Sequence, residues 1–175
     1  KEQGRLSFGF VGGPSQIKGW PLIYQAFTDI SQSNFEGYLV DGSLDGSWWT
    51  DVDISKMQGD WQIHERFAQE NMDGFYAKID VLLFMSQWKE TYGLTIREAL
   101  ARGIRVIQTD SGSTTEHLAA DPTHMLQIGE GSDRLIEKLE AVLDPEYQHP
   151  EKMHVTSFAE QASTMAECLG NLIHR

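Results

Sequence analysis

Residues 80–100 read DVLLFMSQWKETYGLTIREAL, and this stretch decides the fold class. Its first part, Val81 to Phe84, is a continuously apolar run, as in a central strand of a parallel sheet that is covered on both faces. A polar loop with one glycine follows, and a helical pattern of apolar residues begins near Thr95. Strand, loop and helix in this order predict one unit of a parallel α/β sheet.

The same alternation of strand and helix continues outward from this unit in both directions. The expected strands cover residues 6–11, 35–40, 61–66, 81–84, 105–108 and 125–128, and the expected helices cover residues 20–30, 71–79, 95–102, 115–119, 133–143 and 157–173. Residues 42–59 fit neither pattern, so we expect a long loop or a short hairpin there. In it, Trp48 and Trp49 either cover an edge of the core or contact a sugar or a partner. The sequence therefore predicts a single domain over residues 1–175 with an α/β, Rossmann-like, doubly wound parallel sheet.

Composition and charge narrow the classes of partner. A chain of 175 residues with 40% apolar and 23% charged residues has the composition of one globular domain. Its 14 basic and 26 acidic residues give a net charge of −12, which argues against nucleic acid or an anionic membrane surface as a bulk partner. No segment has the roughly 18 apolar residues of a membrane span, and residues 1–6 lack the apolar run of a signal peptide. The single cysteine, Cys168, cannot form an internal disulfide, so we expect a cytoplasmic location.

Ligands of doubly wound sheets bind at the carboxyl ends of the strands, so the loops there hold the candidate functional residues. The first such loop, residues 12–19, reads GGPSQIKG. Its backbone N–H groups at Gly12 and Gly13 and the following helix N-terminus could approach an anion closely, with Lys18 adding positive charge. The spacing matches neither a Walker loop nor a GxGxxG motif. The alternative is an ordinary glycine turn with a solvated lysine.

The second loop carries two carboxylates, Glu90 and Glu98, on either side of a glycine turn and a helix start. Free backbone N–H groups at such a start favour an anion such as a diphosphate. Glu98 could accept hydrogen bonds from a ribose, and Glu90 could reach a sugar. Each acid also has a structural alternative, because Thr95 and Glu98 have the spacing of a capping box and Glu90 fits a solvated loop acid.

The third loop, residues 109–116, reads TDSGSTTE and contains a second capping-box spacing at Ser113 and Glu116. It either lines the same cleft or forms only a structural turn and cap. His64 and His117 stand alone in the sequence, without the spacing of metal ligands, so no metal site is predicted. No Ser/His/Asp or Cys/His arrangement can be made from the residues at the strand ends.

Taken together and in order, these motifs resemble a known family. The residues that carry the resemblance are Asp80 to Phe84, Ser86, Glu90-x-x-Gly93-Leu94, Glu98-Ala99 and Gly103-x-x-Val106-Ile107, with Phe10-Val11-Gly12 and Lys18-Gly19 at the start of the chain. They resemble the C-terminal, donor-binding domain of GT-B glycosyltransferases, specifically the large retaining family 4, whose E-x7-E motif the two acids match. The resemblance covers nearly the whole chain.

The resemblance implies a UDP-, GDP- or ADP-sugar as donor substrate, no metal or other cofactor, and retaining transfer of a hexose-type sugar to an acceptor hydroxyl. It also implies a role for each matching residue. Glu90 would be catalytic and contact the sugar, Glu98 would bind the ribose, and Lys18 would pair with the diphosphate. Further contacts to the diphosphate or sugar would come from Gly12, Gly13, Tyr92, Gly93, Leu94 and Thr95. The family usually has an arginine where this chain has Gly13, which leaves Arg66 or Arg97 as candidate replacements.

Members of this family also have an N-terminal domain that binds the acceptor, which is a glycan, a lipid or a small molecule. We therefore expect this chain to be one domain of a larger enzyme, inactive alone. The resemblance places that enzyme in bacterial polysaccharide biosynthesis, in the cytoplasm or at the membrane periphery. The alternatives are a GT-B nucleotide-sugar epimerase and a non-catalytic nucleotide- or carbohydrate-binding module. A receiver-like signalling domain is disfavoured, because no acidic pair follows the first strand.

Overall fold

The sheet has six strands, all paired in parallel, in the order β3-β2-β1-β4-β5-β6. The computed structural model describes residues 5–116, 121–146 and 158–173. The strands are β1 (Leu6–Phe10), β2 (Phe35–Val40), β3 (Asp60–His64), β4 (Val81–Phe84), β5 (Arg105–Thr109) and β6 (Met125–Leu126). The predicted parallel α/β sheet is confirmed.

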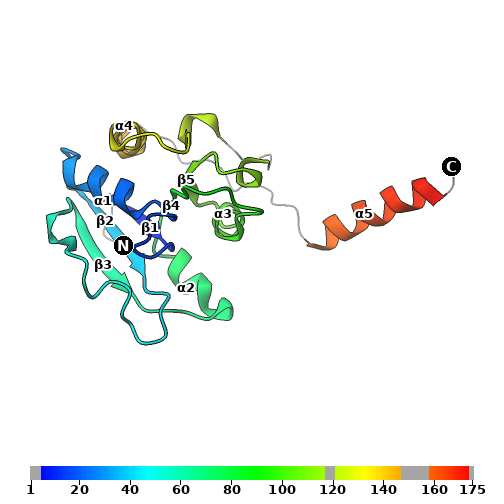
Figure 1. The fold of residues 1–175 in the computed structure, drawn as a ribbon, viewed down its shortest axis with the longest axis horizontal. Helices are drawn as coiled ribbons and strands as arrows, with labels where there is room; N and C mark the ends of the chain where they lie inside the picture. Colours follow the sequence, from blue (N-terminus) through cyan, green and yellow to red (C-terminus); the bar gives the residue numbers. More distant parts are fainter. Residues whose placement is uncertain (1–4, 117–120, 147–157, 174–175) are drawn as a thin grey trace.

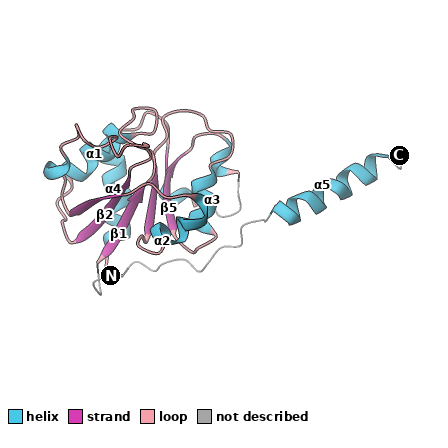
Figure 2. Cartoon of the chain, turned by 90° about the horizontal axis from the view of Figure 1, so that it is seen from below, coloured by secondary structure: helices cyan, strands magenta, loops and turns pink. Residues whose placement is uncertain are grey.

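Helices cover both faces of the sheet (Figures 1 and 2). The covering helices are α1 (Trp20–Asp29), α2 (Met72–Tyr76), α3 (Leu94–Leu100) and α4 (Ser132–Leu143), and a fifth helix, α5 (Phe158–Ile173), does not cover the sheet. Buried residues of α1 and α4 pack in one apolar cluster on one face, and those of α2 and α3 pack in a second cluster on the other. The apolar run of β4 serves both, because Val81 and Leu83 belong to the first cluster and Leu82 to the second. Each such fully buried side chain contributes about 1.5–3 kcal/mol.

The order of the strands creates a topological switch point between β1 and β4. From β1 the chain adds β2 and β3 on one side, and then returns to add β4, β5 and β6 on the other. Open α/β sheets bind ligands at such a switch point, beside the loops that leave the carboxyl ends of the two strands.

The structure changes several of the predicted boundaries. Residues 42–59 form a loop with a 3₁₀ turn at Ile54–Lys56 and no hairpin. Trp49 in this loop is 2% exposed and donates a hydrogen bond to the Val40 carbonyl over 3.1 Å, so its predicted role as a cover of the core is confirmed. The strand predicted to end at residue 128 ends at Leu126, because a turn follows in which the Gln127 N–H donates to the Glu130 carboxylate.

Two predicted helices also differ. The helix expected over residues 71–79 ends at Tyr76, because the N–H groups of residues 78 and 79 bond three residues back, which tightens the last turn before β4. The described part of the helix expected over residues 115–119 is a 3₁₀ turn, Ser113–Thr115, and residues 117–120 lie outside the described chain.

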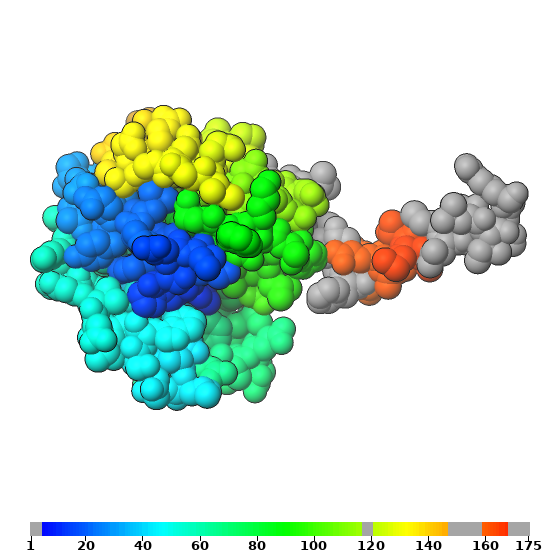
Figure 3. Space-filling model, viewed as in Figure 1, coloured from blue at the N-terminus to red at the C-terminus, as the bar shows by residue number. Residues whose placement is uncertain are grey.

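The predicted helix at the end of the chain is present as α5, and it lies apart from the sheet layers (Figures 1 and 2). In the space-filling view the layers form one closely packed body from which α5 extends (Figure 3). Side chains 159–167 are exposed, and Gln161 Nε2 donates to the Tyr92 hydroxyl over 3.2 Å. Within the described ranges, none of the helices combines the length and apolar character that crossing a membrane requires.

Candidate functional site

Three polar side chains meet at the switch point of the sheet. Lys18 comes from the loop after β1, and its Nζ lies 2.6 Å from Oε1 of Glu90, in the loop after β4. The Ser86 hydroxyl donates to the same oxygen over 2.9 Å. The Lys18 side chain is 42% exposed and that of Glu90 is 24% exposed, so both remain within reach of a ligand. The structure thus brings together two of the residues that the sequence singled out, Lys18 and Glu90.

The surroundings of Glu90 keep it charged. Burial alone would raise the pKa of its carboxyl group, but hydrogen bonds from Lys18 and Ser86, with the charge of Lys18, outweigh burial and lower the pKa. Glu90 is therefore a carboxylate at neutral pH, and a carboxylate only accepts hydrogen bonds.

The loop after β1 lies directly on the chain that leaves β4, and Gly19 makes this approach possible. Its φ is +78°, and a Cβ added there would lie 2.0 Å from the Met85 carbonyl oxygen. The Gln87 N–H donates to the Ile17 carbonyl over 2.7 Å, next to this contact. Only glycine fits at this position, and the close approach fixes Lys18 beside Glu90.

A pocket of about 120 Å³ lies beside the ion pair. Its lining includes Gly12, Lys18 and Thr95, which were candidates from the sequence, together with residues at the ends of β1 and β4. Gly13 lies against the Trp48 ring, since a Cβ added to it would be 2.6 Å from Trp48 Cε3. Trp48, which is 40% exposed, therefore lies next to the site. The helix and strand patterns of the sequence did not predict this position.

The structural alternative for Glu98, a capping box with Thr95, is not formed. Helix α3 begins at Leu94 with Gly93 as its N-cap, and no side chain makes a capping hydrogen bond. Thr95 is therefore already inside the helix, so it cannot act as the cap. Glu98 instead accepts a hydrogen bond from the Tyr76 hydroxyl over 2.9 Å.

The third loop supports the second. The Glu90 N–H donates to the Ser111 carbonyl over 2.8 Å, and Glu90 and Gly112 form an isolated β-bridge. The Thr109 hydroxyl donates to the Ser86 carbonyl over 2.6 Å. The capping box predicted at Ser113 and Glu116 is not formed either, because Gly112 holds the N-cap position of that turn without a side-chain bond. This loop therefore positions the backbone of Glu90.

The arginine candidates lie in different places. The Arg97 guanidinium stacks on the Tyr92 ring, 3.7 Å from its centroid, and donates to the Tyr92 carbonyl. Arg66 is exposed and follows β3, so β2 and β1 lie between its strand and β4. Within the described part of the chain, neither guanidinium is hydrogen-bonded or ion-paired to Lys18 or Glu90, and a replacement for the family arginine stays a prediction.

Across residues 5–116, 121–146 and 158–173, we find no group of three or more His, Cys, Asp or Glu side chains arranged to hold a metal ion. The His64 ring packs edge-on against Phe67 and Phe75, and its Nδ1 lies 2.7 Å from the Glu65 carbonyl. His117 lies outside the described residues.

The fold is similar to those of several solved glycosyltransferase structures. The Anabaena protein HepE, solved in complex with UDP and glucose, matches with a TM-score of 0.64 and 17% identity over 81% of this chain and 40% of that one. The C-terminal domain of a group 1 family glycosyl transferase (LpcC) from Francisella tularensis matches with a TM-score of 0.61 and 18% identity, over 80% of this chain and 76% of that one. The sheet and its helices are therefore those of a GT-B glycosyltransferase domain.

One curated relative is similar in sequence. Spore coat protein SA of Bacillus subtilis (strain 168) is 26% identical over 118 residues, which is 61% of this chain and 31% of that protein. This chain thus spans about a third of the length of that relative and 40% of HepE. None of these matches favours an epimerase or a non-catalytic binding module.

A family model described as glycosyl transferases group 1 matches residues 5–145. That range includes all six strands, the Lys18–Glu90 pair and Glu98. Over most of its length, therefore, the chain belongs to the glycosyl transferases group 1 family.

Proposed function

We propose that this chain is the donor-binding domain of a retaining glycosyltransferase of family 4, and that it binds a nucleotide diphosphate sugar without a metal. The observation that carries the proposal is the meeting of Lys18, Glu90 and Ser86 beside a pocket at the switch point of the sheet. Support also comes from HepE, whose structure contains UDP and glucose.

In this proposal Lys18 binds the diphosphate. Its ammonium group is a compact positive charge that suits phosphate oxygens, and it lies on a loop that only glycine allows to come so close to β4. A diphosphate, with more than one negative charge, competes with Glu90 for this lysine. The backbone at Gly12 and Gly13, and that of Tyr92, Gly93, Leu94 and Thr95, would add contacts to the diphosphate or the sugar.

Glu90 is the proposed catalytic residue and contacts hydroxyl groups of the transferred sugar. Its lowered pKa keeps it a hydrogen-bond acceptor, and its charge favours positive character at the anomeric carbon. The bond from that carbon to the diphosphate oxygen breaks while the acceptor oxygen bonds on the same face. The acceptor proton passes to the departing diphosphate, whose growing charge Lys18 stabilises.

The acceptor belongs to the remainder of the proposed enzyme. We propose that a second domain binds a glycan, a lipid or a small molecule, and that the whole protein is cytoplasmic or associates with a membrane at its periphery. The lengths of the matched proteins support a longer enzyme, since the alignments cover only 31% of spore coat protein SA and 40% of HepE.

Calorimetry on the 175-residue chain tests the proposal. UDP, GDP and ADP are titrated with and without EDTA, and we expect one of them to bind equally well in both conditions. Lys18→Met should weaken that nucleotide by about 10- to 100-fold, because a charge-assisted hydrogen bond contributes about 1.5–3 kcal/mol.

The control is Lys56→Met, which removes an exposed lysine of the 3₁₀ turn in the loop over residues 42–59. This variant should bind as the unmodified chain does. No binding of any of the three nucleotides, or a strict requirement for Mg²⁺ or Mn²⁺, would contradict the proposal.

A further inference from the structure

Tyr76, the last residue of α2, reaches across to α3 and contacts Glu98. The tyrosine is 3% exposed, and its hydroxyl donates to Oε2 of Glu98 over 2.9 Å. The same hydroxyl lies 3.4 Å from the Thr95 carbonyl, one turn earlier on α3. The helical pattern of the sequence identifies Tyr76 only as a core residue, because it contains no information on where the hydroxyl points.

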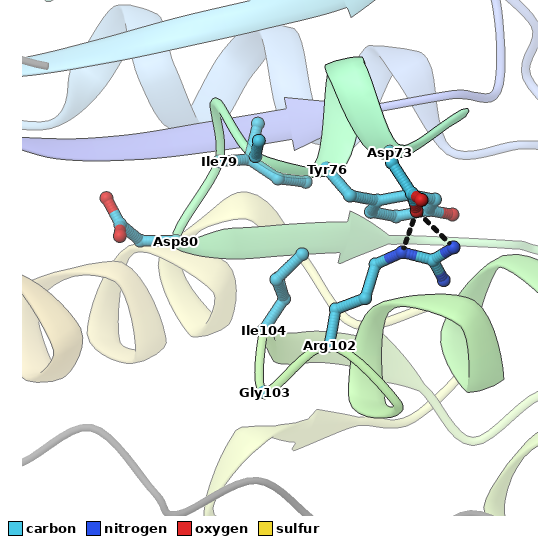
Figure 4. Close-up of a pocket in the computed structure, with 8 residues that line it drawn as sticks. Asp73, Tyr76, Ile79, Asp80, Arg102, Gly103 and Ile104 are labelled. Carbon is cyan, nitrogen blue, oxygen red and sulfur yellow. Dashed lines mark hydrogen bonds and ion pairs between the residues drawn. The ribbon is translucent and has the colours of Figure 1, made fainter. Parts of the chain in front are cut away.

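The Tyr76 ring is held in place by a charged pair. The Arg102 guanidinium lies over the ring, 4.9 Å from its centroid, and donates to Asp73 Oδ1 through Nε (2.8 Å) and Nη2 (2.5 Å). Arg102 Nη1 also donates to the Glu98 carbonyl over 2.8 Å. Figure 4 shows Arg102, Asp73 and the Tyr76 ring together on the wall of a pocket of about 470 Å³. The ring therefore has one well-defined position relative to Glu98.

The Tyr76 hydroxyl can act on Glu98 only as a hydrogen-bond donor. Burial raises its pKa strongly, and the charge of Glu98 and the hydrogen bond to it raise the pKa further, against the opposing charge of Arg102. The hydroxyl thus stays protonated at neutral pH. A carboxylate accepts through both oxygens, so a donor fixed on Oε2 sets the plane in which Oε1 accepts from a ligand.

We propose that Tyr76 is a positioning residue, which orients the Glu98 carboxylate to accept hydrogen bonds from the ribose hydroxyls of the bound nucleotide. This inference rests on the proposed function and deepens it. Tyr76 itself lies behind Glu98 and does not touch the nucleotide. Removing its hydroxyl should therefore weaken only the part of the binding that depends on the ribose hydroxyls.

The test compares two ligands on two forms of the chain. Tyr76→Phe keeps the ring, its packing and its contact with Arg102, and removes only the hydroxyl. The probes are the nucleoside diphosphate that binds among UDP, GDP and ADP, and its 2′,3′-dideoxy form. We expect Tyr76→Phe to raise the Kd of the ribose form by about 3- to 10-fold, the effect of one neutral hydrogen bond, and to leave the Kd of the dideoxy form unchanged.

The matched control is Tyr38→Phe. Tyr38, on β2, also donates its hydroxyl to a glutamate, Glu36, over 3.0 Å, but that pair is not part of the site. This variant should bind both probes as the unmodified chain does. In Glu98→Gln, adding Tyr76→Phe should cause no further loss of ribose-dependent affinity, because the two residues act as one unit.

The outcomes separate this inference from the proposed function. If Tyr76→Phe weakens both probes equally, or if its effect adds fully to that of Glu98→Gln, the positioning role is wrong while nucleotide binding stands. If the unmodified chain binds both probes with the same affinity, Glu98 does not bind the ribose, and the inference is again wrong. If the unmodified chain binds none of the three nucleotides, it is the proposed function that fails.

Discussion

The two edges of the sheet use polar side chains in opposite ways. At the amino edge they join strands to one another: the Ser7 hydroxyl of β1 lies within hydrogen-bond distance of the Lys78 carbonyl (2.7 Å) and of the Asp80 carboxylate just before β4 (2.8 Å). At the carboxyl edge, Lys18 and Glu90 project from glycine-containing loops and stay partly exposed. The amino edge therefore closes the fold, and the carboxyl edge offers charges to a ligand.

The two edges also differ in what holds their charges. At the amino edge, Arg105 is 8% exposed and contacts His124 and Asp121. The charged groups of this cluster therefore interact with one another. At the carboxyl edge, the Lys18–Glu90 pair is held by the close contact between Gly19 and Met85, and Lys18 lines a pocket. Substitutions at the amino edge should change stability, and those at the carboxyl edge should change binding and catalysis, except where they disturb the loop itself.

The exception is Gly19, for which we expect the largest effect. Gly19→Ala places a methyl group 2.0 Å from the Met85 carbonyl oxygen and forces a non-glycine residue to φ +78°. The left-handed conformation costs about 1–2 kcal/mol and the overpacking about 1–3 kcal/mol more, so unfolding in urea should show a loss of about 2–5 kcal/mol.

Gly46→Ala separates the two contributions. Gly46 has nearly the same φ, +76°, but nothing lies within 4 Å of an added Cβ. This variant should lose only the conformational cost, about 1–2 kcal/mol. Equal losses in the two variants would mean that the close contact between the loop after β1 and Met85 does not exist.

The next prediction concerns Glu90 and catalysis. In the proposed full-length enzyme, Glu90→Gln should lower turnover by roughly 10- to 1000-fold, or about 1.4–4 kcal/mol of barrier, because the amide cannot supply the carboxylate charge. Binding of the bare nucleoside diphosphate, measured by calorimetry on this chain, should survive. Near-normal turnover would reduce Glu90 to a solvated loop acid. Glu140→Gln, at an exposed position of α4, is the control.

Ser7→Ala is the counterpart of this variant at the amino edge. It removes the hydrogen-bonding hydroxyl of a residue that is 1% exposed, so a loss of stability of about 1–3 kcal/mol follows. Nucleotide affinity should not change. A Ser7→Ala chain that is fully stable but binds nucleotide poorly would reverse the proposed division between the two edges.

Most of the fold could be predicted from the sequence, because parallel strands that are covered on both faces are apolar throughout. Val81 to Phe84 is such a run, and the helical spacing of α1 and α4 matches the cluster that they bury. What the sequence did not predict are the ends of short elements. The end of β6 depends on one side chain, Glu130, which accepts from a backbone N–H of the following turn. Secondary-structure propensity and hydrophobic periodicity cannot predict a contact of this kind.

For the candidate site, spacing was a good guide to which loops meet and a poor guide to what individual side chains do. The carboxyl ends of adjacent strands place Lys18 near Glu90 in any sheet with this topology. The capping-box spacing of Thr95 and Glu98 was misleading, because Gly93, in the αL conformation, is the N-cap two residues before Thr95. Tyr76 contacts Glu98 and Trp48 contacts Gly13 through tertiary packing, which the local sequence pattern cannot predict.

The smallest effect we predict is a pH dependence of stability that arises at the amino edge, from His124. Its ring is 6% exposed, lies 3.0 Å from Arg105 Nη1, and has Nδ1 2.9 Å from Asp121 Oδ2. Burial lowers its pKa, the charges of Arg105 and Lys138 lower it further, and Asp121 only partly offsets them. Between this lowered pKa and the value near 6.5 of the unfolded chain, the unfolded state binds more protons, so stability falls as the pH falls.

Urea unfolding at several pH values from 7.5 down to 5.5 checks this. We expect the His124→Gln variant to lose less stability over this range than the unmodified chain, with a difference in slope of no more than about 1.4 kcal/mol per pH unit, the limit for one proton. Toward pH 7.5 the contribution of His124 in the unmodified chain should level off, because the histidine is then largely neutral in the folded and the unfolded states. Nucleotide affinity at pH 7.5 should be the same in both. Identical slopes would show that His124 binds protons equally in both states, and a lower affinity in His124→Gln would show that the amino edge is not independent of the site.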